Sequence, residues 1–154
     1  GDTYNTSIGQ YGFQVTPIEM VRAVAALANG GTLVTPSITE PLDSETFAKL
    51  SFEEEDLQVV REGMRMVVTE GGGQLLNSLP FSVAAKTGTA QVGVQKRFVN
   101  AWMVGFFPYE QPRYSFVFLM EHGPGGEAVV GASRAASPFF TWLAENAPEY
   151  TTAE

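Results

Sequence analysis

Four consecutive residues combine the groups needed to bind an anionic peptide substrate: Lys86-Thr87-Gly88-Thr89. The lysine provides a point charge for a carboxylate and biases nearby proton transfers, and the threonine hydroxyls provide hydrogen bonds. Gly88 has no side chain, so a peptide or lactam carbonyl can approach the backbone closely. The N–H of Thr89 is then a candidate donor to an oxyanion, a contact worth about 3 kcal/mol in comparable sites. The motif predicts one wall of an acyl-transfer site, and the alternative is an ordinary exposed strand lysine beside two β-forming residues.

Other residue types that commonly carry catalysis are scarce. There is no cysteine, which excludes disulfides and thiol catalysis, and a single histidine, His122, argues against a histidine-based zinc site. His122 precedes a Gly-Pro-Gly-Gly stretch without a nucleophilic neighbour, so loop hydrogen bonding is favoured over a general-base role. The glycines at 71–73 follow a predicted helix instead of opening one, which is unlike a phosphate cradle. We therefore expect no metal and no cofactor.

The composition is that of a folded protein without a nucleic-acid partner. Of 154 residues, 44% are hydrophobic and 17% are charged, which fits one compact domain or a large piece of one. Acidic residues (17) outnumber Lys and Arg (9), and no basic cluster exceeds Lys96-Arg97. No apolar run has the length of a membrane span. The chain begins at Gly1 with neither a methionine nor a signal peptide, so we expect a fragment or a processed chain.

Apolar residues at helical spacing predict three helices, at about 17–29, 52–70 and 132–146. Thr16 with Glu19, and Ser51 with Glu54, have the spacing of capping boxes at the starts of the first two helices. Residues 1–15 show no helical period, and we expect an irregular lead-in there.

After Pro80 the period changes to the alternation of strands, predicted at about 81–91, 97–107 and 114–121. Both alternating sets within 98–107 are largely apolar, which indicates a sheet covered by helices on both faces. Residues 108–112 predict a hairpin turn, and a Gly/Pro-rich loop is expected at 122–131. Neighbouring antiparallel strands preceded and followed by helices predict an α+β fold, in which helices flank an antiparallel sheet.

Five further residues have less specific chemistry. Gln91, Lys96 and Arg97 lie between the first two predicted strands, where a loop at the rim of a cleft would bring them to a substrate. Trp102 and Trp142 lie in apolar runs and are predicted to be core residues instead of a platform for a ligand.

The segments around the motif resemble a known family. Lys-Thr-Gly-Thr-Ala-Gln at 86–91, Asn-Ala-Trp-Met-Val-Gly-Phe-Phe-Pro at 100–108 and residues 114–121 closely resemble the third, fourth and fifth strands of the penicillin-binding transpeptidase domain. Residues 1–10 and 15–31 resemble the segment that precedes this sheet in class B, monofunctional members. The sequences Asp-Thr-x-Asn and Ile-Gly-Gln in this segment are nearer those of the cell-elongation type than those of the division type. The resemblance covers nearly the whole chain in the right order. It implies part of the fold shared by these transpeptidases and the serine β-lactamases.

The resemblance also implies roles for the motif. The family's site has three elements, Ser-x-x-Lys with the nucleophile, Ser-x-Asn, and Lys-Thr-Gly, and no serine of this chain begins either of the first two. We expect both before Gly1, in an N-terminal part that must complete the domain. Lys86, Thr87, Gly88 and Thr89 would bind the carboxyl-terminal end of a peptidoglycan stem peptide or a β-lactam, with the Thr89 amide in the oxyanion hole. Without a nucleophile, the isolated chain is expected to be inactive.

The first hypothesis is the C-terminal part of a D,D-transpeptidase that cross-links D-Ala-D-Ala stem peptides and is acylated by penicillin. The family context implies a parent protein anchored at the extracytoplasmic face of the bacterial cytoplasmic membrane. The alternative is a β-lactam sensor or a non-catalytic binding module of the same fold. A serine β-lactamase is the third possibility and would need a water-activating residue that we do not find in this sequence.

Overall fold

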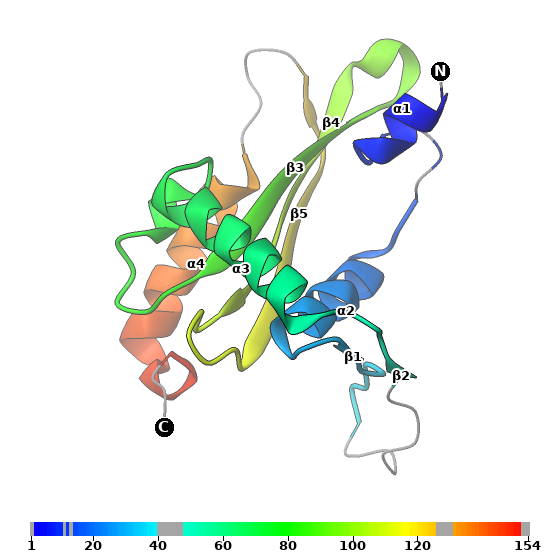
Figure 1. Ribbon diagram of the computed structural model, residues 1–154. Helices are drawn as coiled ribbons and strands as arrows, with labels where there is room; N and C mark the ends of the chain where they lie inside the picture. The colour runs from blue at the N-terminus through cyan, green and yellow to red at the C-terminus, as the bar shows by residue number, and fades with distance from the viewer. Residues whose placement is uncertain (1, 11, 13, 40–47, 126–130, 152–154) are drawn as a thin grey trace.

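The computed structural model describes residues 2–10, 12, 14–39, 48–125 and 131–151 (Figure 1). Its elements, in chain order, are α1 (Asp2–Ser7), α2 (Pro17–Ala28), β1 (Thr32–Leu33), β2 (Ala48–Lys49), α3 (Glu54–Thr69), β3 (Ala84–Val92), β4 (Phe98–Phe107), β5 (Tyr114–Pro124) and α4 (Ala132–Asn146). Short 3₁₀ turns lie at Gln74–Leu76, Val94–Lys96 and Pro148–Tyr150. Among the described residues, no helix is both long and apolar enough to cross a membrane.

The main sheet has the order β3-β4-β5, and both pairings are antiparallel. Lys86 lies opposite Val104, and Thr89 lies opposite Ala101. β1 and β2 form a separate two-stranded ribbon. β4 and β5 are joined by the predicted hairpin, so the expected α+β fold with adjacent antiparallel strands is confirmed.

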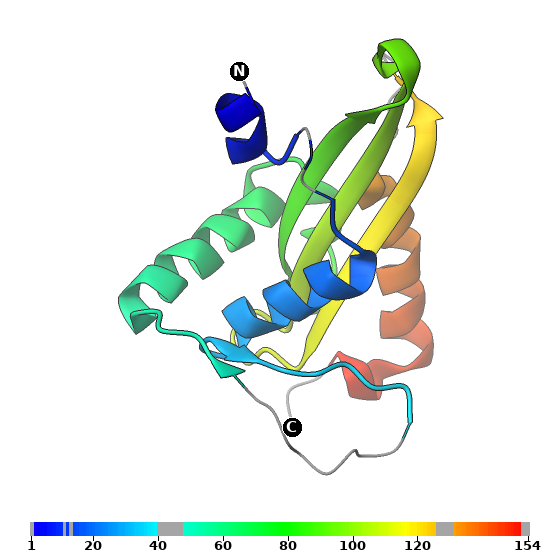
Figure 2. The ribbon, with the colours of Figure 1, turned by 90° about the vertical axis from the view of Figure 1, so that its right-hand side faces the viewer.

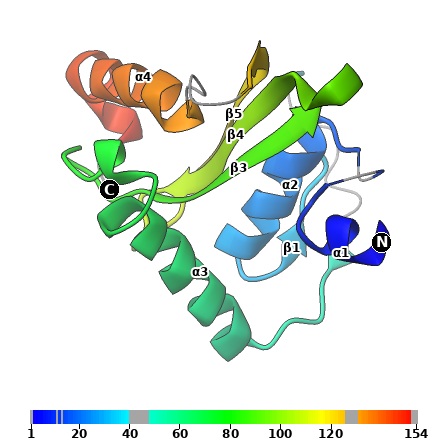
Figure 3. The ribbon, with the colours of Figure 1, turned by 90° about the horizontal axis from the view of Figure 1, so that it is seen from above.

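Helices cover both faces of the sheet, as the two apolar sets of β4 predicted. Figure 3 shows α4 on one side of the sheet and α2 and α3 on the other. Residues of one alternating set, such as Met103, pack with Phe140 of α4, whereas residues of the other set, such as Phe106, pack with Val24 of α2. The sheet is therefore the middle layer between two hydrophobic cores.

The two predicted helix caps have different outcomes. The capping box of Thr16 and Glu19 at the start of α2 is confirmed. The second prediction was wrong: Glu53 is the cap of α3 and makes no side-chain capping bond. The carboxylate of Glu54 instead lies 2.6 Å from the guanidinium of Arg61. Because α3 begins two residues later than predicted, Glu54 is its first residue instead of its third, which is the position that a capping box requires.

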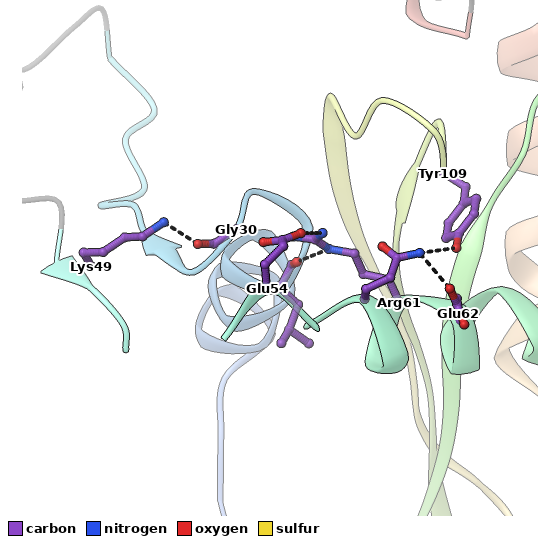
Figure 4. Close-up of polar contacts among 8 residues, drawn as sticks. Gly30, Lys49, Glu54, Arg61, Glu62 and Tyr109 are labelled. Atoms are coloured by element: carbon purple, nitrogen blue, oxygen red, sulfur yellow. Dashed lines mark hydrogen bonds and ion pairs between the residues drawn. The ribbon is translucent and has the colours of Figure 1, made fainter. Parts of the chain in front are cut away.

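Arg61 joins α3 to the end of α2 (Figure 4). Besides its ion pair with Glu54, its Nε donates to the carbonyl of Leu27 at 2.7 Å. Nearby, the ammonium of Lys49 donates to the carbonyl of Gly30, just after α2. Because these cations satisfy carbonyls at or just beyond the last turn of α2, they also complement the negative end of its dipole.

One helix was not predicted, and two strand ends differ from their predicted positions by three residues. The expected irregular lead-in contains α1, whose six residues are too few to show a period. β3 begins at Ala84 rather than at residue 81, because its partner β4 ends at Phe107. β5 continues to Pro124 into the predicted loop, since a bulge at Val99/Ala101 lets the ladder resume. Part of that loop, residues 126–130, lies outside the described residues.

Phe140 is the central side chain of the core beneath α4. It is fully buried, and its ring centroid lies 4.9 Å from that of Phe116 and 5.3 Å from that of Phe107. We expect Phe140→Ala to lower the free energy of unfolding by about 3–5 kcal/mol, because it removes apolar contacts and leaves a cavity. The neighbouring Phe139 is 45% exposed, so Phe139→Ala is the control and should cost about 1 kcal/mol. Equal losses in urea unfolding would contradict this assignment of the core.

The cap of α2 should make stability depend on pH. The backbone N–H of Thr16 and then its hydroxyl donate to the Glu19 carboxylate, at 2.7 and 2.8 Å, and hold the pKa of Glu19 below its ordinary value of 4.5. The carboxylate therefore contributes stability above pH 4.5, and this contribution is lost as the pH falls through the lower folded pKa. Urea unfolding of the wild type and Glu19→Gln should differ at pH 7 and converge in acid. A difference that grows in acid would show the opposite linkage.

Candidate active site

A cleft of about 430 Å³ lies on the α2 side of the sheet and contains the whole 86–89 motif. Its walls come from β3, β4, the start of α2 and the segment that follows α1. The lining residues are Ile8, Gly9, Gln14, Val15, Met20, Lys86, Thr87, Gly88, Thr89, Ala90, Val92, Asn100, Trp102 and Val104. Figure 2 shows α1 beside the β3 side of the sheet, and the residues that line the cleft come from positions far apart in sequence.

Strand alternation determines which side chains reach the cleft. Ala84, two residues before Lys86, packs against the α2 core, and Ala85 packs against the α4 core. Lys86 and Gly88 therefore belong to the α2 face, where the cleft lies. Lys86 is exposed, and its ammonium donates to the backbone carbonyl of Thr87. The charge is thus at the cleft and accessible to a ligand.

The other edge of β3 has no strand partner in the described residues. The side-chain amide of Gln10 donates to the carbonyl of Thr89 at 3.0 Å, so this carbonyl points away from β4. In an antiparallel ladder the N–H and C=O of one residue point to the same side. The N–H of Thr89 is therefore also directed to the free edge, where a ligand in the cleft can accept from it.

Gly88 leaves the floor of the cleft open. A methyl group added to it would meet only the Cβ of Trp102, at 3.7 Å, which is an ordinary contact. The turn after α3 lies close to Thr87, the residue before Gly88. A methyl group added to Gly72 would lie 3.6 Å from the Thr87 hydroxyl. The glycines at 71–73 thus let α3 end close to the motif.

Three cleft residues on β4 were not predicted as site residues: Asn100, Trp102 and Val104. Trp102, predicted as core, is only partly buried and lines the cleft while also packing against the α2 core. Asn100 lines the cleft, and its side-chain oxygen accepts from the backbone N–H of His122 at 3.0 Å. A polar residue within an otherwise apolar strand was the available signal. The core prediction for Trp142 was wrong, because α4 presents it to solvent and it is 56% exposed.

The remaining candidates lie outside the cleft lining. Gln91 is an exposed residue near the end of β3, and Lys96 and Arg97 lie in the turn that joins β3 to β4. Arg97 donates to the side-chain oxygen of Gln95 at 3.1 Å. The ring of His122 packs edge-on against Phe98. Within the described ranges, no group of three or more acidic, histidine or cysteine side chains is placed to hold a metal ion.

The family described as the penicillin binding protein transpeptidase domain matches residues 1–141. The chain belongs to this family. It is 30% identical to the peptidoglycan D,D-transpeptidase MrdA of Acinetobacter baumannii, over 93% of this chain and 24% of that protein. It is 32% identical to the stage V sporulation protein D of Bacillus subtilis, over 94% of this chain and 24% of that protein. The chain thus spans about a quarter of the length of these relatives.

Solved structures of the family have the same fold. The penicillin-binding protein PBP2 of Helicobacter pylori aligns with a TM-score of 0.73 and 31% identity, over 95% of this chain and 27% of that one. PBP2 of Pseudomonas aeruginosa aligns with a TM-score of 0.76 and 26% identity, over 100% of this chain and 36% of that one. These matches confirm the predicted family and fold, and the names MrdA and PBP2 fit the predicted elongation type.

Adding a methyl group should change stability little at Gly88 and lower it strongly at Gly105. In Gly88→Ala the new methyl meets no atom closer than 3.7 Å, so we expect the free energy of unfolding to change by less than about 1 kcal/mol. In Gly105→Ala, on the adjacent strand, it would clash with the carbonyl oxygen of Ala84 and lie 2.6 Å from the Phe116 ring. Overpacking there should cost at least about 1–3 kcal/mol. Thermal and urea unfolding would compare the pair, and a large loss for Gly88→Ala alone would mean that the floor of the cleft is closed.

Proposed function

We propose that this chain is the C-terminal part of the transpeptidase domain of a peptidoglycan D,D-transpeptidase and forms one wall of its acyl-transfer site. The observation that carries the proposal is the arrangement on β3. Lys86 and Gly88 face the cleft, and the backbone N–H of Thr89 is directed to the free edge of the same strand. Membership of the family and the names of the relatives support it.

The motif residues have distinct tasks in the proposed reaction. The Lys86 ammonium binds the terminal carboxylate of a D-Ala-D-Ala stem peptide or the corresponding carboxylate of a β-lactam, and Thr87 lies beside it in the cleft lining. Gly88 lets the reacting carbonyl approach the strand, and the N–H of Thr89 donates to the oxygen that becomes negative. These groups orient the carbonyl and stabilise its tetrahedral state, but they cannot open the bond.

A serine from outside this chain is proposed to supply the missing step. Its oxygen adds to the carbonyl carbon, the bond to the leaving nitrogen breaks, and that nitrogen takes up a proton. The products are an acyl-enzyme and free D-Ala, or an opened β-lactam ring that stays attached. An amine of a second stem peptide then accepts the acyl group and restores the serine. The partners are thus peptidoglycan peptides, β-lactams and the segment that holds the serine. The site of action is the extracytoplasmic face of the bacterial cytoplasmic membrane.

Labelling with a fluorescent penicillin tests the proposal. The isolated chain should remain unlabelled, whereas the complete transpeptidase domain should be labelled covalently. In the complete domain, Lys86→Ala should slow acylation by about 10- to 100-fold, because a hydrogen bond to a charged group contributes about 1.5–3 kcal/mol.

Lys49→Ala is the matched control for this substitution. Lys49 is also an exposed strand lysine that donates to a backbone carbonyl, but it lies in β2 and does not line the cleft. Labelling of the isolated chain would contradict the external nucleophile, and equal rates for the two variants would contradict the role of Lys86. If labelled domain loses the acyl group slowly and forms no cross-links, a sensor is favoured over a transpeptidase.

A further inference from the structure

The side chain of Gln10 occupies a backbone acceptor of Thr89, one of the residues that line the cleft. Its Nε2 donates to the carbonyl of Thr89 at 3.0 Å, across 79 residues of sequence. Gln10 is partly buried, and the two residues before it, Ile8 and Gly9, line the cleft. A glutamine amide therefore already lies against the strand that carries the motif.

The end of α1 holds Gln10 in this position. Gly9 has a φ of +73°, its N–H donates to the carbonyl of Thr6 at 3.0 Å, and the N–H of Gln10 donates to the carbonyl of Asn5 at 2.8 Å. This pair of bonds around a left-handed glycine is a Schellman motif, which ends a helix and sets the direction of the residue that follows. Gln10 is thus fixed through its backbone at one end and through its amide at the other.

The acceptor that Gln10 occupies is also the one that an extended peptide needs. A peptide that adds to the edge of a sheet exchanges backbone bonds with alternate residues of the edge strand. At Thr89 it would accept from the N–H and donate to the carbonyl, because both point to the free edge. The N–H of such a ligand and the amide of Gln10 approach the same carbonyl from the same side.

We propose that Gln10 is a specificity-determining residue, whose amide stands in for the ligand N–H at the Thr89 carbonyl and is displaced when a ligand with an N–H binds there. This inference rests on the proposed function. In the empty site the bond satisfies the carbonyl and shields an edge that would otherwise be open to pairing with another chain. A ligand with a well-placed N–H exchanges one hydrogen bond for another. A ligand without that N–H has nothing to offer the carbonyl and leaves Gln10 in place.

The test compares acylation of the complete transpeptidase domain by two penicillins that differ at one atom. The first has an acylamino side chain with its N–H, and in the second this nitrogen is methylated. Gln10→Ala should raise the second-order acylation rate for the first by about 2- to 10-fold, because the competing bond is gone, and should leave the rate for the second unchanged. Gln10→Glu cannot donate to the carbonyl either, but its negative charge should slow both penicillins, so it should share with Gln10→Ala only the raised ratio of the first rate to the second.

Gln74→Ala is the matched control, since Gln74 is exposed and its Nε2 donates to the carbonyl of Thr69 at 3.5 Å, outside the cleft. It should change neither rate. A purely structural role of Gln10 would shift both penicillins equally and lower the melting temperature, and that result would overturn the inference, as would unchanged rates for both. If the wild-type domain is labelled by neither penicillin, the proposed function itself fails, and the inference fails with it.

Discussion

The pairing of β3 with β4 on one edge only is the constraint on which the site depends. The register that places Lys86 opposite Val104 puts the small residues Ala84 and Ala85 in the two cores and the motif beyond them. Because backbone groups alternate along a strand, the same pairing leaves the N–H and C=O of Thr89 on the free edge. A shift by one residue would exchange the two faces and bury the lysine.

The two cores keep this strand in place. Aromatic rings from β4, β5 and α4 pack edge-on beneath one face, and α2 and α3 cover the other. Gly105 allows the Phe116 ring and the Ala84 carbonyl to approach β4 more closely than any side chain would permit. A strand held between packed layers has little freedom to move, so the directions of its backbone donors are fixed.

The cleft is assembled from distant parts of the chain, and we propose that a segment outside this chain completes it. The segment after α1 supplies Ile8 and Gln10, α2 supplies Met20, and the sheet supplies the motif. This wall contains backbone donors and a lysine ammonium, and the chain spans about a quarter of the length of its relatives.

Local physical chemistry explains what the sequence alone determined. The cap at Thr16, the alternation of β4 and the motif at 86–89 depend on neighbours within a few residues, so the helices, the antiparallel strands and the principal candidate residues could be predicted. The cap at Ser51 could not, because α3 begins at Glu54 and the Glu54 carboxylate binds Arg61, about two turns further along the helix, rather than the backbone N–H of Ser51.

Only the tertiary structure placed Asn100 and Trp102 beside the motif, and only it brought Gln10 to Thr89. These contacts join residues far apart in sequence, up to 79 positions, and no local pattern encodes them. They arise from the register of β3 on β4 and from the direction in which Gly9 ends α1, both of which are decided by packing across the whole chain.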